Sequence, residues 1–265
     1  MSIINWIYFP MRLAWRQLIF DRTKLMVAIC GVLFACVLVF MQLGFRDALY
    51  ASATSAPVKL DGDLFLMHKQ SEAMWRPIKF KRSELMRTLG NPAVADISPL
   101  YLGLAPFKNI ETRVKRTLMV YGFDPDSSSF RIEAVNSKQE QLKLKDTVLF
   151  DEYSRPEFGP IGQLIAANRG LTEINDYKVS IIGLFRMGVS FAADGNVITS
   201  DLNFMRIFPG RNLDEIDVGV IKLNRGSSPS QVKNELEPLL TESINIFTYP
   251  ELLQFEQNYW ANMAP

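Results

Sequence analysis

The stretch Leu25–Phe45, LMVAICGVLFACVLVFMQLGF, decides the architecture of this chain. Its 21 residues include no charged side chain, and Gln42 is the one strongly polar residue among them. As an α-helix the stretch would extend about 31 Å, which matches a bilayer hydrocarbon core of about 30 Å. A lone segment in lipid must pair its own backbone groups, so the sequence predicts a membrane-spanning helix from Leu25 to Phe45.

Two alternatives compete with this interpretation of the stretch. A cleavable signal peptide would also place an apolar run here, and Ala51-Ser52-Ala53 would suit a peptidase. However, the apolar run and the segment before it are both longer than such a peptide requires. A buried helix of a globular protein would rarely extend so far without a charge. We therefore favour a retained anchor.

The charges on either side of the anchor predict its orientation. Residues 1–24 carry four cations, Arg12, Arg16, Arg22 and Lys24, against the single anion Asp21. Residues 46–265 carry a slight acidic excess. Because cations favour the cytoplasmic side, the N-terminus is expected in the cytoplasm and residues 46–265 in the periplasm. The chain would then reside in the cell inner (plasma) membrane.

The segment before the anchor predicts an amphipathic helix that begins near Pro10. One helical arc gathers Met11, Ala14, Trp15, Leu18 and Ile19, with Arg12 and Arg16 beside it. Such a helix would rest on the cytoplasmic leaflet, its cations near anionic headgroups. Packing against a neighbouring protein is the alternative.

Composition excludes several classes of protein. The chain has 265 residues, of which 48% are apolar, 11% aromatic and 22% charged, with a formal net charge of +1. The aromatic content and low net charge exclude intrinsic disorder. The near-neutral balance also argues against a nucleic-acid partner.

The beginning and the end of the outer region show similar patterns. In the first, Asp63–Met67 and Ala93–Ile97 predict strands, and Ser83 is expected to cap the helix between them. The apolar face expected for that helix comprises Leu85, Met86 and Leu89. In the second, the alternation of Ile216, Val218 and Val220 predicts a strand, and Ser228–Gln231 resembles a capping box at the start of a helix. Ile244–Thr248 predicts the strand that follows this helix. The stripe of its helix comprises Val232, Leu236, Leu239 and Leu240.

Two such units predict an α+β fold: a ferredoxin-like split βαβ sandwich with an inserted subdomain. The insertion, residues 105–200, is expected to be mainly β, because Arg116–Tyr121 and Val179–Phe185 are β-rich and Asp194-Gly195-Asn196 signals a turn. Only Asn136–Leu144 within it is expected to be helical. A last helix is expected over residues 250–265. Its large apolar side chains are Leu252, Leu253, Phe255 and Trp260.

Motifs that would carry catalysis are missing from the sequence. His68 is the single histidine, so there is no second imidazole for a metal or a proton relay. No Walker lysine loop and no GxGxxG motif occurs. Asp124-Pro125-Asp126 with Ser128 lacks the glycine and glutamate of a calcium loop, and we interpret it as a turn. We expect no cofactor, no metal and no enzymatic activity.

The densest basic run lies between the first predicted strand and helix. It comprises Arg76, Lys79, Lys81, Arg82 and Arg87, with Trp75 and Phe80 between them. Such runs are usually solvated faces; the functional reading is contact with an anionic lipid headgroup or an acidic partner.

Four stretches carry a family resemblance. They are Met41–Tyr50 (MQLGFRDALY), Tyr121–Pro125 (YGFDP), Val148–Pro160 (VLFDEYSRPEFGP), and Gly183-Leu184-Phe185 followed by Gly188 and Ser190–Asn196 (SFAADGN). In these stretches, in order along nearly the whole chain, the sequence resembles the DevC-type permeases of cyanobacterial ABC exporters, relatives of the MacB and FtsX permease group.

The resemblance implies a permease subunit with a MacB-like periplasmic core domain over residues 46–265. Two permeases would form a homodimer and pair with a separate cytoplasmic ATPase and a periplasmic membrane-fusion protein, which meets a TolC-like outer-membrane channel. The cargo would be lipid-like, such as a glycolipid. ATP hydrolysis would move the periplasmic domains mechanically.

The sequence departs from that family where it stops, at Asn262–Pro265, about where a second membrane helix is expected. A truncated or divided permease is one reading. A single-pass, envelope-anchored binding or scaffold module without transport is the alternative, and a secreted enzyme would require cleavage near Ala53.

Overall fold

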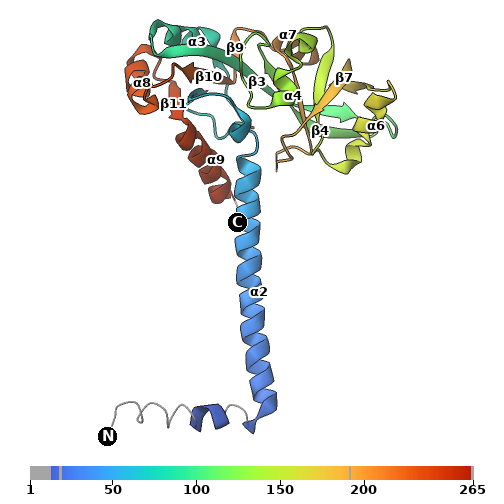
Figure 1. Ribbon diagram of the computed structural model, residues 1–265, viewed down its shortest axis with the longest axis vertical. Helices are drawn as coiled ribbons and strands as arrows, with labels where there is room; N and C mark the ends of the chain where they lie inside the picture. Colours follow the sequence, from blue (N-terminus) through green and yellow to red (C-terminus); the bar gives the residue numbers. More distant parts are fainter. Residues whose placement is uncertain (1–12, 18–19, 191, 264–265) are drawn as a thin grey trace. The chain divides into compact units, whose positions relative to one another are not determined.

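The computed structural model describes residues 13–17, 20–190 and 192–263 (Figure 1). Of the predicted N-terminal helix, Leu13–Gln17 are helical, whereas Pro10, Met11, Arg12, Leu18 and Ile19 lie outside the described residues. The chain divides into two compact units that meet between Leu49 and Tyr50.

Helix α2 (Arg22–Ala53) contains the whole of Leu25–Phe45. Its most apolar 18-residue window has a mean hydropathy of 2.6, and none of that window is buried inside the protein. Large apolar side chains such as Phe34 and Phe40 are 66% and 72% exposed. A helix that is apolar on all sides needs an apolar surround, so by length and composition α2 can cross a membrane.

The second unit contains a nine-stranded sheet in the order β11-β1-β10-β3-β4-β8-β5-β7-β6. Its first four strands are β11 (Ile244–Thr248), β1 (Leu64–His68), β10 (Val218–Leu223) and β3 (Val94–Lys108). Neighbours among these four are antiparallel. Helix α3 (Arg82–Arg87) connects β1 to β3, and α8 (Pro229–Leu236) connects β10 to β11. Two interleaved β-α-β units of this order confirm the predicted ferredoxin-like α+β fold.

The remaining strands belong to the inserted segment. They are β4 (Lys115–Phe123), β8 (Asn196–Ser200), β5 (Thr147–Asp151), β7 (Tyr177–Phe185) and β6 (Leu171–Ile174). Strand β6 also pairs with the far end of β3, through Phe107 and Ile174. This pairing closes β3, β4, β8, β5, β7 and β6 into a small barrel. Its interior is filled by Phe107, Phe150 and Phe158, whose ring centroids lie 5.3 to 5.6 Å apart.

Shorter elements complete this unit. They are β2 (Phe80–Lys81) paired with β9 (Glu215–Ile216), the helices α4 (Glu133–Asn136), α5 (Gln139–Leu142), α6 (Ile161–Ala166), α7 (Asp201–Ile207) and α9 (Tyr249–Met263), and the 3₁₀ turns η1 (Pro57–Lys59), η2 (Thr88–Gly90), η3 (Pro156–Phe158) and η4 (Glu237–Leu239).

Both faces of the ferredoxin-like sheet are covered. Leu64 and Leu66 of β1 pack into one apolar cluster, and Phe65 and Met67 pack into another, all four with no exposed surface. Such burial on both faces explains why the strand is apolar at every position instead of at alternate positions.

Several expectations about the helices were wrong in detail. Helix α3 begins at Arg82, with Lys81 and not Ser83 as its N-cap, and continues as a 3₁₀ turn. Because a 3₁₀ turn has three residues per turn, Leu89 leaves the α-helical stripe and is 48% exposed, while Met86 on the short helix is 49% exposed.

Corrections also apply to the second unit and the insertion. Ser228 is the N-cap of α8, but its side chain makes no capping hydrogen bond. Leu239 lies in η4 and is 48% exposed. The helical stretch Asn136–Leu144 is divided between α4 and α5, and α6 is a further helix that a six-residue segment could not signal by periodicity.

Candidate functional site

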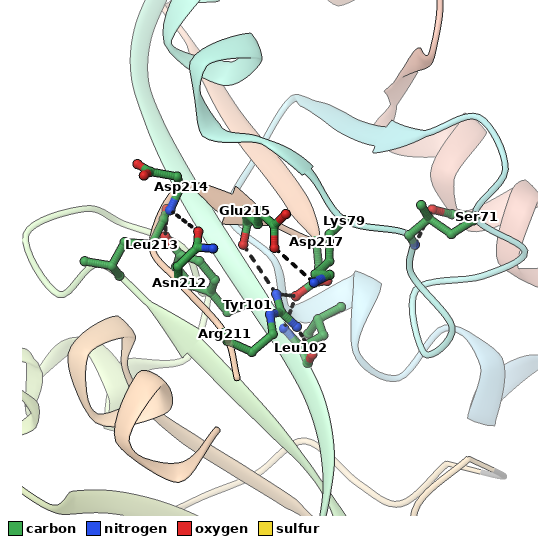
Figure 2. Close-up of polar contacts among 11 residues, drawn as sticks. Ser71, Lys79, Tyr101, Leu102, Arg211, Asn212, Leu213, Asp214, Glu215 and Asp217 are labelled. Atoms are coloured by element: carbon green, nitrogen blue, oxygen red, sulfur yellow. Dashed lines mark hydrogen bonds and ion pairs between the residues drawn. The ribbon is translucent and has the colours of Figure 1, made fainter. Parts of the chain in front are cut away.

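Strand β3 changes its partner near its midpoint, and a polar joint lies there (Figure 2). Leu100 pairs with Val218 of β10 on one edge and with Phe123 of β4 on the other. Strand β10 does not extend to Leu102. Instead, the Leu102 amide donates to Asp217 Oδ2 at 2.7 Å, and Arg211 Nη1 donates to the Leu102 carbonyl at 3.3 Å. Two side chains thus replace a neighbouring strand.

We call Leu102, Arg211 and Asp217 the polar joint. Arg211 Nη2 lies 2.6 Å from Asp217 Oδ2, with the two side chains 16% and 1% exposed. The guanidinium carbon also lies 5.5 Å from the centroid of the Phe204 ring. Burial raises the pKa of the Asp217 carboxyl, and the charge of Arg211 opposes that rise. A buried ion pair of this kind is costly to break, because one partner would remain charged and unpaired.

The polar joint is incompletely hydrogen-bonded. Among the described residues, Asp217 Oδ1 and Arg211 Nε have no hydrogen-bond partner. Each such atom loses its hydration without compensation, which costs about 1–3 kcal/mol. The joint is therefore better explained by the positioning of β3 and β10 than by a net gain in stability.

The loop before β10 is held on β3 by further contacts (Figure 2). The Tyr101 hydroxyl of β3 donates to the Leu213 carbonyl at 2.8 Å, and within the loop the Asp214 amide donates to Asn212 Oδ1 at 3.0 Å. Burial raises the pKa of Tyr101 to about 12, so this phenol stays a hydrogen-bond donor. These contacts join the ferredoxin-like part to the barrel without a flexible linker.

A second polar cluster connects two of the stretches that carry the family resemblance. The fully buried carboxylate of Asp151 accepts hydrogen bonds from the amides of Met187 at 3.0 Å and Gly188 at 2.8 Å, and from Asn196 Nδ2 at 2.8 Å. Gly188 has a φ of 102°, a backbone conformation that favours glycine. The residue types of these stretches are thus explained by a structural role: they fasten the end of β5 to the segment after β7.

The predicted basic run is largely paired with carboxylates. Four of its five cations form ion pairs. The distances between the side-chain nitrogen and the carboxylate oxygen are 2.8 Å for Arg76–Glu72, 2.9 Å for Lys79–Glu215, 3.9 Å for Arg82–Asp124 and 3.0 Å for Arg87–Glu84. Lys81 is exposed and has no ion pair within the described part of the chain. Exposed pairs contribute little stability, but they lower the local positive potential. Lys81 is therefore the one cation of the run whose charge is not paired within the described residues.

The other sequence-selected residues have structural surroundings. His68 ends β1, and its Nδ1 accepts the Gln70 amide at 3.2 Å. The Asp126 amide donates to Asp124 Oδ1 at 3.0 Å, which confirms the predicted turn. In the part of the chain that the structure describes, no three His, Cys, Asp or Glu side chains gather as metal ligands.

Sequence reasoning missed the polar joint. Asp217 lies between Ile216 and Val218, where an alternating strand would place an outward-facing polar residue. No local spacing marks it as buried, and its partner Leu102 lies 115 residues away.

Comparisons with known proteins give the following result. No protein-family model matches the chain, and no curated protein matches it. The periplasmic region of MacB from Actinobacillus actinomycetemcomitans is similar at 13% identity and a TM-score of 0.49, covering 74% of this chain and 92% of that one. The extracellular domain of the noncanonic ABC-type transporter YknZ from Gram-positive bacteria is similar at 12% identity and a TM-score of 0.47, covering 71% and 99%.

Proposed function

We propose that this chain is the permease subunit, or the N-terminal portion of one, of an ABC exporter of the DevC/MacB-like kind. Residues 1–24 would lie at the cytoplasmic surface of the inner membrane, residues 25–45 would span it, and residues 46–265 would form the periplasmic core domain. The sequence stretches that resemble DevC-type permeases support this assignment.

The observation that carries the proposal is the combination of α2 with a domain whose two parts are joined at the polar joint. Helix α2 is apolar enough to cross a membrane. The ferredoxin-like part and the barrel share one strand and are held there by Arg211 and Asp217. Two parts that share one strand would move together when either is displaced, which is what mechanical export requires of the domain.

The partners follow from the same proposal. Two copies would form a homodimer and act with a separate cytoplasmic ATPase and a periplasmic membrane-fusion protein, and through that protein with a TolC-like channel. The cargo would be lipid-like, a glycolipid being the leading case. Arg76, Lys79, Lys81, Arg82 and Arg87 would contact the fusion protein or anionic membrane lipid, with Lys81 the most available.

Topology labelling tests the anchor. In a background with Cys30→Ala and Cys36→Ala, a membrane-impermeant maleimide should label Ser228→Cys in cells with a permeabilised outer membrane. Ser2→Cys should be labelled only after the inner membrane is disrupted. The reverse pattern, or a mature chain that begins near Ala53, would contradict the proposal.

Purification from native membranes tests the partners. A tagged chain expressed from its own locus and extracted in mild detergent should recover a nucleotide-binding ATPase and a membrane-fusion protein. Recovery of the folded chain without either partner would instead favour the single-pass scaffold.

A further inference from the structure

Strand β11 is an open end of the nine-stranded sheet. Within the described chain it pairs with β1 on one edge, whereas the strand at the other end of the sheet, β6, pairs back onto β3. A terminal strand presents backbone N–H and C=O groups along its free edge, and these groups can pair with a further strand. The free edge of β11 is therefore a candidate docking surface.

The hydrogen-bond pattern shows which residues of β11 face that edge. The Lys69 amide donates to the Ser243 carbonyl at 2.7 Å, directly before β11. In an antiparallel ladder such pairs alternate with pairs whose backbone groups point away from the neighbouring strand. Counting from Ser243, the backbone groups of Ile244, Ile246 and Thr248 point to the free edge.

Two of these three amides already have partners. The Ile244 amide donates to the Thr241 carbonyl at 3.0 Å, and the Thr248 amide donates to Glu251 Oε2 at 2.7 Å. In the described part of the chain, the Ile246 amide has no partner outside the ladder. Ile246 is thus the centre of the edge that remains available.

An open groove of about 350 Å³ lies along β11, between α8 and α9 (Figure 1). Lys233 and Glu237 line it on the α8 side, one helical turn apart, and the amide side chains of Gln254 and Asn258 line it on the α9 side. Lys233 Nζ lies 2.8 Å from Glu251 Oε2. Glu237 is exposed and forms no ion pair among the described residues, so the groove carries one unpaired negative charge.

We propose that a second copy of this chain docks in this groove, with the two β11 strands antiparallel about a two-fold axis at Ile246. The Ile246 amide of each copy donates to the carbonyl of the partner's Ile246. The two α8 helices are then antiparallel, so each Lys233 meets the partner's Glu237, and this ion pair is made twice. Gln254 and Asn258 supply both donors and acceptors, which makes the α9 side compatible with its own copy.

The two faces of the sheet favour a second copy over a foreign strand. Leu85 of α3 and Val232 of α8 pack on one face, whereas Leu252 of α9 and Leu60, which follows α2, pack on the other. A two-fold axis normal to the sheet keeps like faces together, so both chains enter the paired domains on the same face. Two anchors in one membrane require this. Anchoring also raises the effective concentration, which strengthens a small interface. The inference rests on the proposed membrane-anchored homodimer and assigns it a contact surface.

Disulfide crosslinking in native membranes tests the register. With Ile246 at the axis, Asn245 lies opposite the partner's Phe247, with Cα atoms about 4.5 Å apart and within reach of a disulfide. Two Asn245 residues are diagonal neighbours, about 7–8 Å apart and beyond that reach. In a background with Cys30→Ala and Cys36→Ala, chains with Asn245→Cys and with Phe247→Cys are expressed together under different tags. They should give at least about fivefold more linked dimer than either chain alone.

Equal yields from the mixed and the single preparations, or no linked dimer in any of them, would overturn the proposal. A link from Asn245→Cys to a chain of another mass would show that a different protein fills the groove, and would overturn it as well. Adding Glu237→Lys to both chains places lysine against lysine and should lower the yield by at least about threefold. Glu133→Lys, a matched reversal at an exposed carboxylate that does not line the groove, should leave the yield unchanged.

Amide hydrogen exchange needs no variant, so it covers the case in which Phe247→Cys fails to fold. In the full chain in neutral detergent, exchange at Ile246 should slow as the protein concentration rises, because its amide gains an acceptor. Exchange that stays the same at every concentration would refute the contact.

Recovery of partners from the same membranes separates this proposal from the exporter assignment. A chain that recovers the ATPase and the fusion protein but gives no link through β11 would overturn the contact surface alone. A linked dimer without either partner would support the surface and count against the exporter.

Discussion

The backbone amide of Leu102 donates a 2.7 Å hydrogen bond to the carboxylate of Asp217, 115 residues further along the chain. Leu102 lies where β3 passes from the ferredoxin-like part into the barrel, and Asp217 directly precedes β10. This bond fixes the point at which the ferredoxin-like part and the barrel meet. Its loss should therefore destabilise both parts.

Asp217→Ala should be strongly destabilising, because it leaves the Leu102 amide and the buried Arg211 guanidinium without their acceptor. We expect a loss of about 3–5 kcal/mol in the free energy of unfolding. Urea unfolding of the full chain in detergent, followed by near-ultraviolet circular dichroism, measures it. Asp126→Ala removes a carboxylate that is 78% exposed and should cost less than about 1 kcal/mol.

A double-mutant cycle separates the charge from the packing. Asp217→Ala combined with Arg211→Met removes both charges and should recover part of the stability lost in Asp217→Ala alone. Strictly additive losses would show that the two side chains do not act as a pair.

The stability of the domain should depend on Glu256 of α9, a buried carboxyl whose Oε1 accepts the Met74 amide at 2.7 Å and whose pKa is raised by its burial. Its pKa is about 7 in the folded chain against an ordinary value of 4.5, so between these values the folded state holds a proton that the unfolded state has released. The stabilisation is therefore fully present below about pH 4.5 and is lost as the pH rises through about 7, by about 3 kcal/mol in all. Glu256→Gln cannot titrate and should flatten this part of the profile. Parallel profiles for the wild type and Glu256→Gln would contradict the expectation.

If the proposed contact with a membrane-fusion protein involves the basic run, Lys81→Glu should weaken it without unfolding the domain. Lys81 is exposed and unpaired within the described residues, so its reversal breaks no ion pair there. We expect recovery of the fusion protein with the tagged chain to fall by at least about fivefold. Lys145→Glu, at a side chain that is 69% exposed, is the matched control. Equal recovery with both variants would refute the contact.

Gly188→Ala should destabilise the barrel. The φ of 102° is unfavourable for alanine, and relaxing it would move an amide that donates to Asp151. A loss of about 1–3 kcal/mol is expected from thermal unfolding of the full chain. Gly210→Ala serves as the control, because a side chain there meets nothing within 4 Å. If the two variants unfold at the same temperature, the strained conformation is not required.

Local patterns predicted many elements well. Alternation and flanking polar residues placed a strand at Ile244–Thr248, where β11 lies, and a helix over residues 250–265, of which the described part lies in α9 (Tyr249–Met263). The order of the first and last units along the chain was enough to predict the ferredoxin-like part. These features depend on residues close together in sequence.

The long strand β3 was harder to predict because Pro99 and Pro106 interrupt its sequence. In the structure neither proline costs a ladder hydrogen bond. Pro99 precedes Leu100, the first residue paired with β4, and Pro106 lies beyond the end of β10 and before the pairing of Phe107 with β6. Prolines are tolerated where no donor is needed, and only the completed sheet reveals such positions. The polar joint likewise arises from distant segments, which sequence spacing cannot bring together.

Strand β3 belongs to both the ferredoxin-like part and the barrel, and this limits how the molecule can be re-engineered. Cutting out the barrel would remove the second half of β3, which pairs with β4 and β6, while its first half stays paired with β10. A hybrid that exchanges barrels between related chains must therefore be joined within β3 near Leu100. The residues that correspond to Arg211 and Asp217 must come from the same chain as the barrel.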